Sequence, residues 1–279
     1  MSQQVDQKQV TSYWESEVCG TRFASKTLDD ISYAKKISAS RYQCEPFIPA
    51  FAGFSLNNSN KKILEVGVGA GTDFIEWIRS GAECYGVDIT DAAIQQATKN
   101  ISVVLNISEH NINIQKASAE QLPFDDDTFD IVYSYGVLHH APFTMKCLSE
   151  AIRVLKPGGQ LKIMVYSSFS STGIMLWIVH GLFKLQPFLT QEHIISCRLE
   201  SPGTKSYSKY ELRKILEGFG LHSIELKKYA GSGDLLLMPA SAKYQDSYLY
   251  YAAKRLFPRN FIRRFQNFLG LALTAVATK

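Results

Sequence analysis

The pattern of apolar and polar positions between residues 61 and 166 predicts an alternating series of strands and helices. Helical spacing is clearest in the segment that Thr90 caps, where apolar residues recur from Ala93 to Val104. Because short loops join strands to helices in alternation, we expect a parallel sheet covered on both faces. The expected strands are residues 62–66, 83–88, 112–115, 129–134 and 160–166, and two further helices are residues 72–80 and 144–155.

The segments before and after residues 61–166 do not show this alternation of strands and helices. Residues 1–55 are typical of helices of mixed polarity, and a polar linker follows at 56–60. Beyond the core we expect a hydrophobic helix within 167–203, a helix at 208–219, a strand at 221–229, and a final short strand at 271–279 on the sheet edge. We therefore predict one integrated α/β domain with a doubly wound, mostly parallel seven-stranded sheet. Its parts are an N-terminal helical cap (1–55), a core (56–166), and C-terminal helical insertions with the final strands (167–279).

A glycine-rich turn, Glu65 to Gly71, joins the first strand to its helix. Ligands of open parallel sheets bind at such turns, where glycine allows close approach and helix N–H groups can hold an anion. A purely structural tight turn is the alternative. The sixth position of the dinucleotide fingerprint requires glycine or alanine, but here it is Thr72, so the spacing is GxGxG and a nicotinamide dehydrogenase is disfavoured. Glu65, two residues before the first glycine, could hold an ammonium group or order the turn.

Polar residues also follow the other expected strands. Asp88 ends the second strand, where a carboxylate can accept hydrogen bonds from both ribose hydroxyls; capping the next helix is the alternative. The loop containing Ser118 would lie over an adenine ring. The fourth strand leads into His139 and His140 at the same edge of the sheet.

Together these segments resemble the class I S-adenosylmethionine-dependent methyltransferases, within the group of the ubiquinone and menaquinone C-methyltransferases and many small-molecule methyltransferases. The matching blocks are LEVGVGAGTD, YGVDIT, ASAEQLPFDDDTFDIVYSYGVLHH and EAIRVLKPGGQLKI, in the same order. The resemblance implies a Rossmann-like methyltransferase fold, S-adenosylmethionine as cofactor, and a core at 56–166 that binds it.

The resemblance also implies the residues that hold the cofactor. Glu65 and the glycines would line the methionine half, Asp88 the ribose, and Ala119 with Glu120 the adenine edge. Relatives often have Asp where this chain has Ser118, so Ser118, Glu120 or a backbone group would take the adenine amino group instead. The expected set is Glu65, Gly67, Gly69, Gly71, Thr72, Asp88, Ile89, Ser118, Ala119, Glu120, Ser134 and Tyr135.

The expected reaction is an in-line methyl transfer to a small-molecule acceptor, for which alignment and exclusion of water are the main requirements. Where the acceptor needs a base, His139 and His140 are the candidates, with packing roles as the alternative. Tyr13, Trp14, Arg41 and Tyr42 could form a lid over the cofactor, and Trp177 could roof a partly apolar acceptor pocket; ordinary core packing is the alternative. The five cysteines form no CxxC pair, so no metal site is expected.

Charge and hydropathy restrict the other function classes. A net charge of +4 without a concentrated basic face does not favour a nucleic-acid partner. RNA or protein methylation and a non-catalytic cofactor-binding scaffold remain alternatives. The first residues are polar, and the most apolar run, residues 173–183, is shorter than the roughly 20 residues that span a membrane. We therefore expect a cytoplasmic protein without stable membrane insertion. The basic aromatic stretch 248–268 is either an amphipathic helix that touches lipid or a solvated face packed on the domain.

Overall fold

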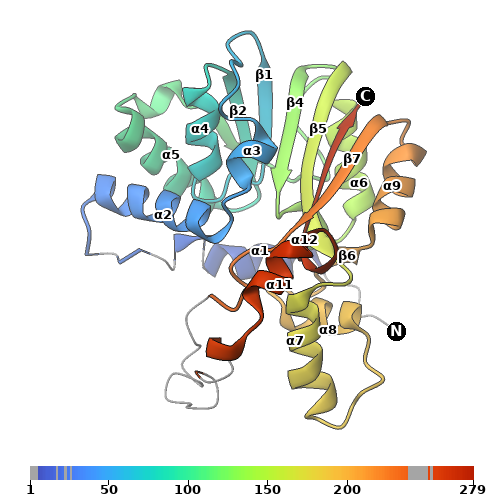
Figure 1. The fold of residues 1–279 in the computed structure, drawn as a ribbon. Coiled ribbons are helices and arrows are strands. Elements are labelled where there is room, and N and C mark those ends of the chain that lie inside the picture. The colour runs from blue at the N-terminus through green and yellow to red at the C-terminus, as the bar shows by residue number, and fades with distance from the viewer. Residues whose placement is uncertain (1–5, 17, 22–23, 26, 238–250, 252–253) are drawn as a thin grey trace.

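The computed structural model describes residues 6–16, 18–21, 24–25, 27–237, 251 and 254–279. Its strands form one sheet in the order β3-β2-β1-β4-β5-β8-β7, with β6 paired to β5 (Figure 1). All pairs are parallel except those of β8, which runs antiparallel to β5 and β7. This confirms the predicted mostly parallel α/β fold. The strands are β1 (Lys62–Val66), β2 (Glu83–Asp88), β3 (Ile114–Lys116), β4 (Phe129–Tyr135), β5 (Leu155–Ser167), β6 (Ser206–Tyr207), β7 (His222–Tyr229) and β8 (Ala272–Thr278).

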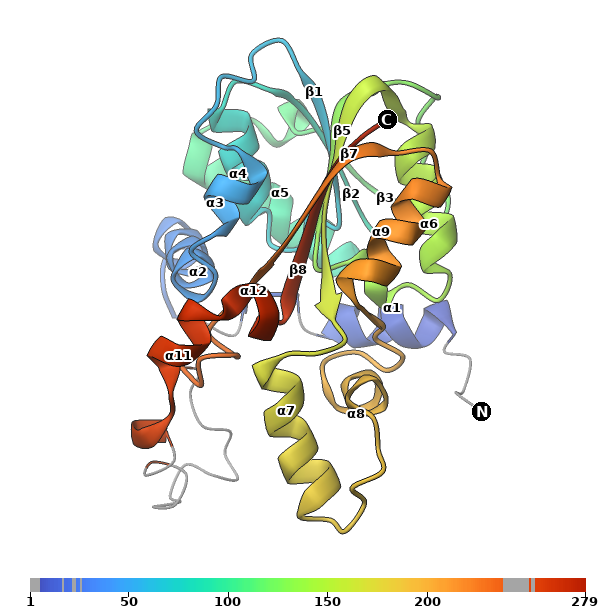
Figure 2. The ribbon, with the colours of Figure 1, turned by 45° about the vertical axis from the view of Figure 1, so that its right-hand side comes forward.

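Helices cover both faces of the sheet (Figure 2). On one face, α3 (Ile48–Ala52), α4 (Thr72–Arg79) and α5 (Asp91–Leu105) bury Phe51, Trp77 and Ile101 in one core cluster. On the other face, α6 (Thr144–Arg153) and α9 (Lys209–Gly218) bury Leu148 and Leu216 in a second cluster. Other helical elements of the described residues are α1 (Gln7–Ser16), α2 (Asp30–Cys44), η2 (Glu109–Asn111), η3 (Leu138–His140), α7 (Ser171–Trp177), the π-helical η4 (Ile178–Leu182), α8 (Gln191–Arg198), α11 (Arg259–Arg264) and α12 (Gln266–Leu269).

Local chemistry explains why several elements begin where the sequence predicted. The Thr90 side chain accepts a hydrogen bond from the Ala93 N–H and so caps α5, as expected. Ser208 and Glu211 form a reciprocal capping box at the start of α9. The bounds predicted for β1 and β2 are those observed, because each is a short apolar run bounded by polar or glycine-rich turns.

The last strand was predicted at the sheet edge, and this is wrong. β8 lies between β5 and β7, and β7 forms the edge. Leu273, Ala275 and Ala277 are buried on one face, while Ala272 and Thr274 are buried on the other. A strand that is apolar or small on both faces can be covered by helices on each side, which is typical of an interior position.

The other C-terminal predictions need smaller changes. The single hydrophobic helix expected within 167–203 is divided into α7 with η4 and a separate α8. Residues 248–250, 252 and 253 of the basic aromatic stretch lie outside the described residues, and its described end forms the short helices α11 and α12. Among the described residues, no helix is both long and apolar enough to cross a bilayer.

Candidate active site

A cavity of ≈ 440 Å³ opens at the carboxyl ends of β1, β2 and β4. It lies where the strand order reverses between β1 and β4, which is the position at which open α/β sheets bind ligands. Most of the cofactor residues expected from the sequence line it together. These are Glu65, Gly67, Gly69, Thr72, Asp88, Ile89, Ser118, Ala119 and Tyr135.

The glycine turn owes its shape to close packing. Gly67 has φ 86°, and a Cβ added there would lie 2.2 Å from the Val137 side chain. Gly71 has φ 77°, and its Cβ would lie 3.1 Å from the Ala97 backbone of α5. Only glycine combines a positive φ with this lack of space. Gly71 is not among the residues that line the cavity; it lets α4 approach α5 closely.

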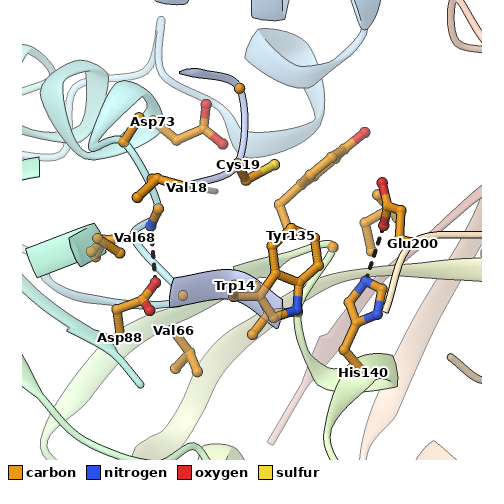
Figure 3. Close-up of a pocket in the computed structure, with 18 of the residues that line it drawn as sticks. Trp14, Val18, Cys19, Val66, Val68, Asp73, Asp88, Tyr135, His140 and Glu200 are labelled. Carbon is orange, nitrogen blue, oxygen red and sulfur yellow. Dashed lines mark hydrogen bonds and ion pairs between the residues drawn. The ribbon is translucent and has the colours of Figure 1, made fainter. Parts of the chain in front are cut away.

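Asp88 orders this turn from the neighbouring strand (Figure 3). Its Oδ2 accepts the Gly69 N–H at 3.1 Å, and its Oδ1 accepts both the N–H and the hydroxyl of Thr90. The sequence offered two alternatives for Asp88, contact with the ribose and capping of the next helix. The observed position allows this carboxylate both to contact a ligand and to order the local backbone. Burial raises the pKa of Asp88, while the hydrogen bonds from Gly69 and Thr90 lower it.

Glu65 lies on the cavity wall at the end of β1, and its carboxyl group is buried. It is 4% exposed, and its Oε2 has no hydrogen-bond partner among the described residues. Burial raises the pKa of Glu65 well above its ordinary value; Asp73 adds to the shift and Arg41 opposes it. A buried acceptor without a donor costs free energy, so this side of the cavity fits a ligand that brings a positive charge. The ammonium group of S-adenosylmethionine meets that requirement.

The expected adenine side contains one residue that the sequence did not indicate. Gln7 of α1 lines the cavity, and its Nε2 donates to Ser118 Oγ at 2.8 Å. Glu120 does not line the cavity. Its Oε1 instead accepts a hydrogen bond from the Phe143 N–H at 3.1 Å. Ser134 is also directed elsewhere, because its hydroxyl donates to the Val66 carbonyl between β4 and β1.

The N-terminal segment closes the cavity, and α1 lies across the carboxyl end of the sheet (Figure 2). Trp14 lines the cavity, and its ring contacts His140 edge-on at a centroid distance of 5.2 Å (Figure 3). Glu15 accepts hydrogen bonds from the N–H groups of Asp91 and Ala92 at the start of α5. These contacts hold the C-terminal end of α1 over the site, and the bond from Gln7 to Ser118 holds its N-terminal end.

The other expected lid residues take different positions. Arg41 lines the cavity and pairs with Asp73. Tyr13 packs against the Trp14 ring, and the Tyr42 hydroxyl donates to Asp73, but neither lines the cavity. Trp177 lies on α7 beside Gly181, outside the cavity wall.

The two candidate bases differ in environment. His140 lines the cavity, with Nδ1 2.8 Å from Ser201 Oγ and 2.9 Å from Thr204 Oγ1. His139 does not line the cavity and is fully buried against Tyr166. Burial, followed by the charge of His140, lowers the pKa of His139 well below its ordinary value, so this imidazole is neutral.

Glu200 completes the His140 environment and was not predicted from the sequence. Its Oε2 lies 3.3 Å from His140 Nε2 and accepts the Tyr166 hydroxyl at 2.7 Å (Figure 3). The only signal in the sequence is the polar run Glu200-Ser201-Pro202-Gly203-Thr204. The resulting acid–imidazole pair can accept and pass on a proton.

Comparison with known proteins agrees with this geometry. The methyltransferase domain family matches residues 64–163. The demethylmenaquinone methyltransferase of Clavibacter sepedonicus is 32% identical over 111 residues, which are 39% of this chain and 43% of the relative. The chain spans less than half the length of the first curated relatives it matches, between 38% and 44%.

Solved structures extend the likeness in fold to nearly the whole chain. A chain from the complex between the Haloferax volcanii Trm112 methyltransferase activator and a methyltransferase has a TM-score of 0.62 at 18% identity, covering 96% of both chains. The geranyl diphosphate C-methyltransferase of Streptomyces coelicolor A3(2), solved with S-adenosyl-L-homocysteine, has a TM-score of 0.58 at 16% identity, covering 98% of this chain and 97% of the other. Residues 64–163 of this chain are therefore similar to a methyltransferase domain, and the fold around them is that of solved methyltransferases.

Proposed function

We propose that the protein transfers the methyl group of S-adenosylmethionine to a small, partly apolar acceptor. The observation that carries this proposal is the unpaired Oε2 of Glu65, buried beside the glycine turn in a cavity at the switch point of the sheet. When bound, the cofactor supplies a methyl group that its sulfonium sulfur already activates. The protein therefore has mainly to bind, align and exclude water.

The chain supplies groups for each part of the cofactor. Glu65 would pair with the ammonium group, and the backbone of the glycine turn would approach the methionine half. Asp88 would accept hydrogen bonds from the ribose while holding the Gly69 N–H. Gln7 and Ser118 would meet the adenine edge, because Gln7 still has an amide oxygen that can accept from the adenine amino group.

The acceptor would bind in the part of the cavity bounded by aromatic residues. Trp14, Tyr135 and Tyr166 line it together with Met164 and Leu199. This mixture of apolar surface and few polar groups is typical of small-molecule sites. A relative named as a demethylmenaquinone methyltransferase supports a small-molecule acceptor.

The pair of His140 and Glu200 would handle the proton that an oxygen or nitrogen acceptor loses. His140 reaches the cavity, and Glu200 accepts a hydrogen bond from the Tyr166 hydroxyl, which holds the carboxylate beside the imidazole. Ser201 and Thr204 hold the imidazole from its other nitrogen. Glu200 and these hydroxyls therefore fix the orientation of His140 before the reaction begins.

Cofactor binding gives the direct test. S-adenosylhomocysteine should raise the melting temperature of the purified protein, and NAD should not. Asp88→Ala should abolish the shift, while Tyr210→Ala, a change at an exposed position of α9, should preserve it. Absence of stabilisation in the wild-type protein would falsify the proposal.

Incubation with methyl-labelled cofactor and an extract of the source organism would then identify the acceptor.

A further inference from the structure

The tip of the α7–α8 hairpin exposes an unusual concentration of large apolar side chains. Leu182, Phe183, Leu185 and Phe188, here called the apolar tip, are 46%, 75%, 90% and 97% exposed. Single exposed apolar residues are normal on soluble proteins. Four within seven residues of one protruding tip form a contiguous surface, and such surfaces mark interaction sites.

A second exposed surface combines aromatic rings with positive charge. Phe261, Phe265 and Phe268 of α11, α12 and their junction are exposed, and Arg263 and Arg264 between them are exposed as well. We call these five residues the basic aromatic patch. Residues 251–279 contain no Asp or Glu, and no carboxylate in the described part of the chain pairs with either arginine. Within the described part of the chain, the patch therefore presents positive charge that no ion-paired carboxylate offsets.

Both surfaces lie on the same side of the protein. In both views, the α7–α8 hairpin and α11 project beyond the end of the sheet to which β5 points (Figures 1 and 2). This is also the side of the cavity, because Thr172 of α7 and Leu199, which follows α8, contribute to the cavity wall. The hairpin thus connects the cavity directly to the apolar tip.

We propose that this side docks on the surface of an anionic lipid bilayer. Phe and Leu side chains at a protruding tip bury their apolar surface at the boundary between headgroups and acyl chains. Adjacent arginines are attracted to anionic headgroups, and no described carboxylate forms an ion pair with them that would offset this attraction. Positive charge combined with apolar residues favours an anionic membrane over a neutral one. Docked in this way, the cavity lies close to the membrane, from which an acceptor with an apolar tail could enter.

Vesicle flotation with the full chain tests the proposal. Wild-type protein should float with vesicles of phosphatidylcholine mixed with phosphatidylglycerol, and much less with phosphatidylcholine alone. The triple variant F183S/L185S/F188S should lower the partition coefficient by at least about tenfold, and R263E/R264E should do the same. High salt should weaken the binding of the wild type because it screens the arginines.

Two matched controls separate docking from general adhesion. K35E/K36E reverses the charge of an adjacent exposed pair on α2, and Tyr210→Ser removes an exposed ring from α9. Both should float like the wild type, and all variants should retain the wild-type circular dichroism spectrum and stabilisation by S-adenosylhomocysteine. The proposal is overturned if wild-type protein ignores anionic vesicles, or if K35E/K36E loses as much binding as R263E/R264E. Since cofactor binding is measured separately, failure here leaves the proposed methyl transfer standing.

Discussion

Arg41 of α2 donates two hydrogen bonds to the carboxylate of Asp73 in α4, at 2.8 Å to Oδ1 and 2.5 Å to Oδ2. Asp73 is buried and also accepts the hydroxyls of Tyr42 and Tyr133. The Arg41 guanidinium lies 4.9 Å from the centre of the Tyr135 ring, on the cavity wall. The N-terminal cap is therefore joined to the core by a buried ion pair that also shapes the cavity.

Arg41→Met should destabilise the protein by about 3 kcal/mol, because it leaves the Asp73 charge buried with only tyrosine donors. The Arg41 side chain is 22% exposed, so solvent screens this pair weakly. Arg79→Met provides the control: it breaks an i,i+3 pair with Glu76 whose arginine is 50% exposed, and should cost less than about 1 kcal/mol. Urea denaturation measures both values, and equal losses would contradict a special role for the Arg41 pair.

Glu65 should make the cofactor-free protein less stable as the pH rises. Its pKa is raised in the folded state, so the folded protein binds the proton more tightly than the unfolded chain does. The stabilisation is present below the unfolded pKa and is lost as the pH rises through the folded pKa. Glu65→Gln should remove this contribution. Urea denaturation at about pH 5 and about pH 8 should therefore show a smaller decline for the variant than for the wild type; identical declines would mean that Glu65 titrates normally.

His140→Ala should lower the rate of methyl transfer to an oxygen or nitrogen acceptor by about 100-fold or more, the range typical of a lost general base. His139→Ala should leave the rate per folded molecule nearly unchanged, since His139 does not line the cavity, but it should lower the melting temperature by leaving a void in the core. Initial rates with the labelled cofactor measure the difference. If the His139 variant loses the larger share of activity, the assignment of the base is wrong.

Glu15→Ala should loosen α1 and speed the release of S-adenosylhomocysteine by about fivefold, because two hydrogen bonds to the start of α5 are lost. Stopped-flow displacement measures the dissociation rate. Glu109→Ala, at an exposed position outside the cavity wall, should leave that rate unchanged. An unchanged rate in the Glu15 variant as well would show that α1 does not limit cofactor release.

The sequence alone determined the parts of this protein that depend on neighbouring residues. The bounds of β1 and β2 follow from apolar runs, the cap at Thr90 from its hydroxyl, and the turn at Gly67 to Gly71 from the freedom of glycine at positive φ. The interactions that define these features reach over only a few residues. The segments that contain these signals, in their order along the chain, also carry the family resemblance that implied the cofactor domain.

Only the tertiary structure decided which side chains reach the cavity. Gln7 meets Ser118 across 111 positions of sequence, and Glu200 faces His140 from a loop after α8. Within one expected motif, Ser118 lines the cavity while Glu120 turns toward Phe143, and of two adjacent histidines only His140 reaches the wall. β8 likewise takes an interior place that its own residues permit but do not specify. Such outcomes depend on how distant segments pack against each other, and local periodicity carries no information about that packing.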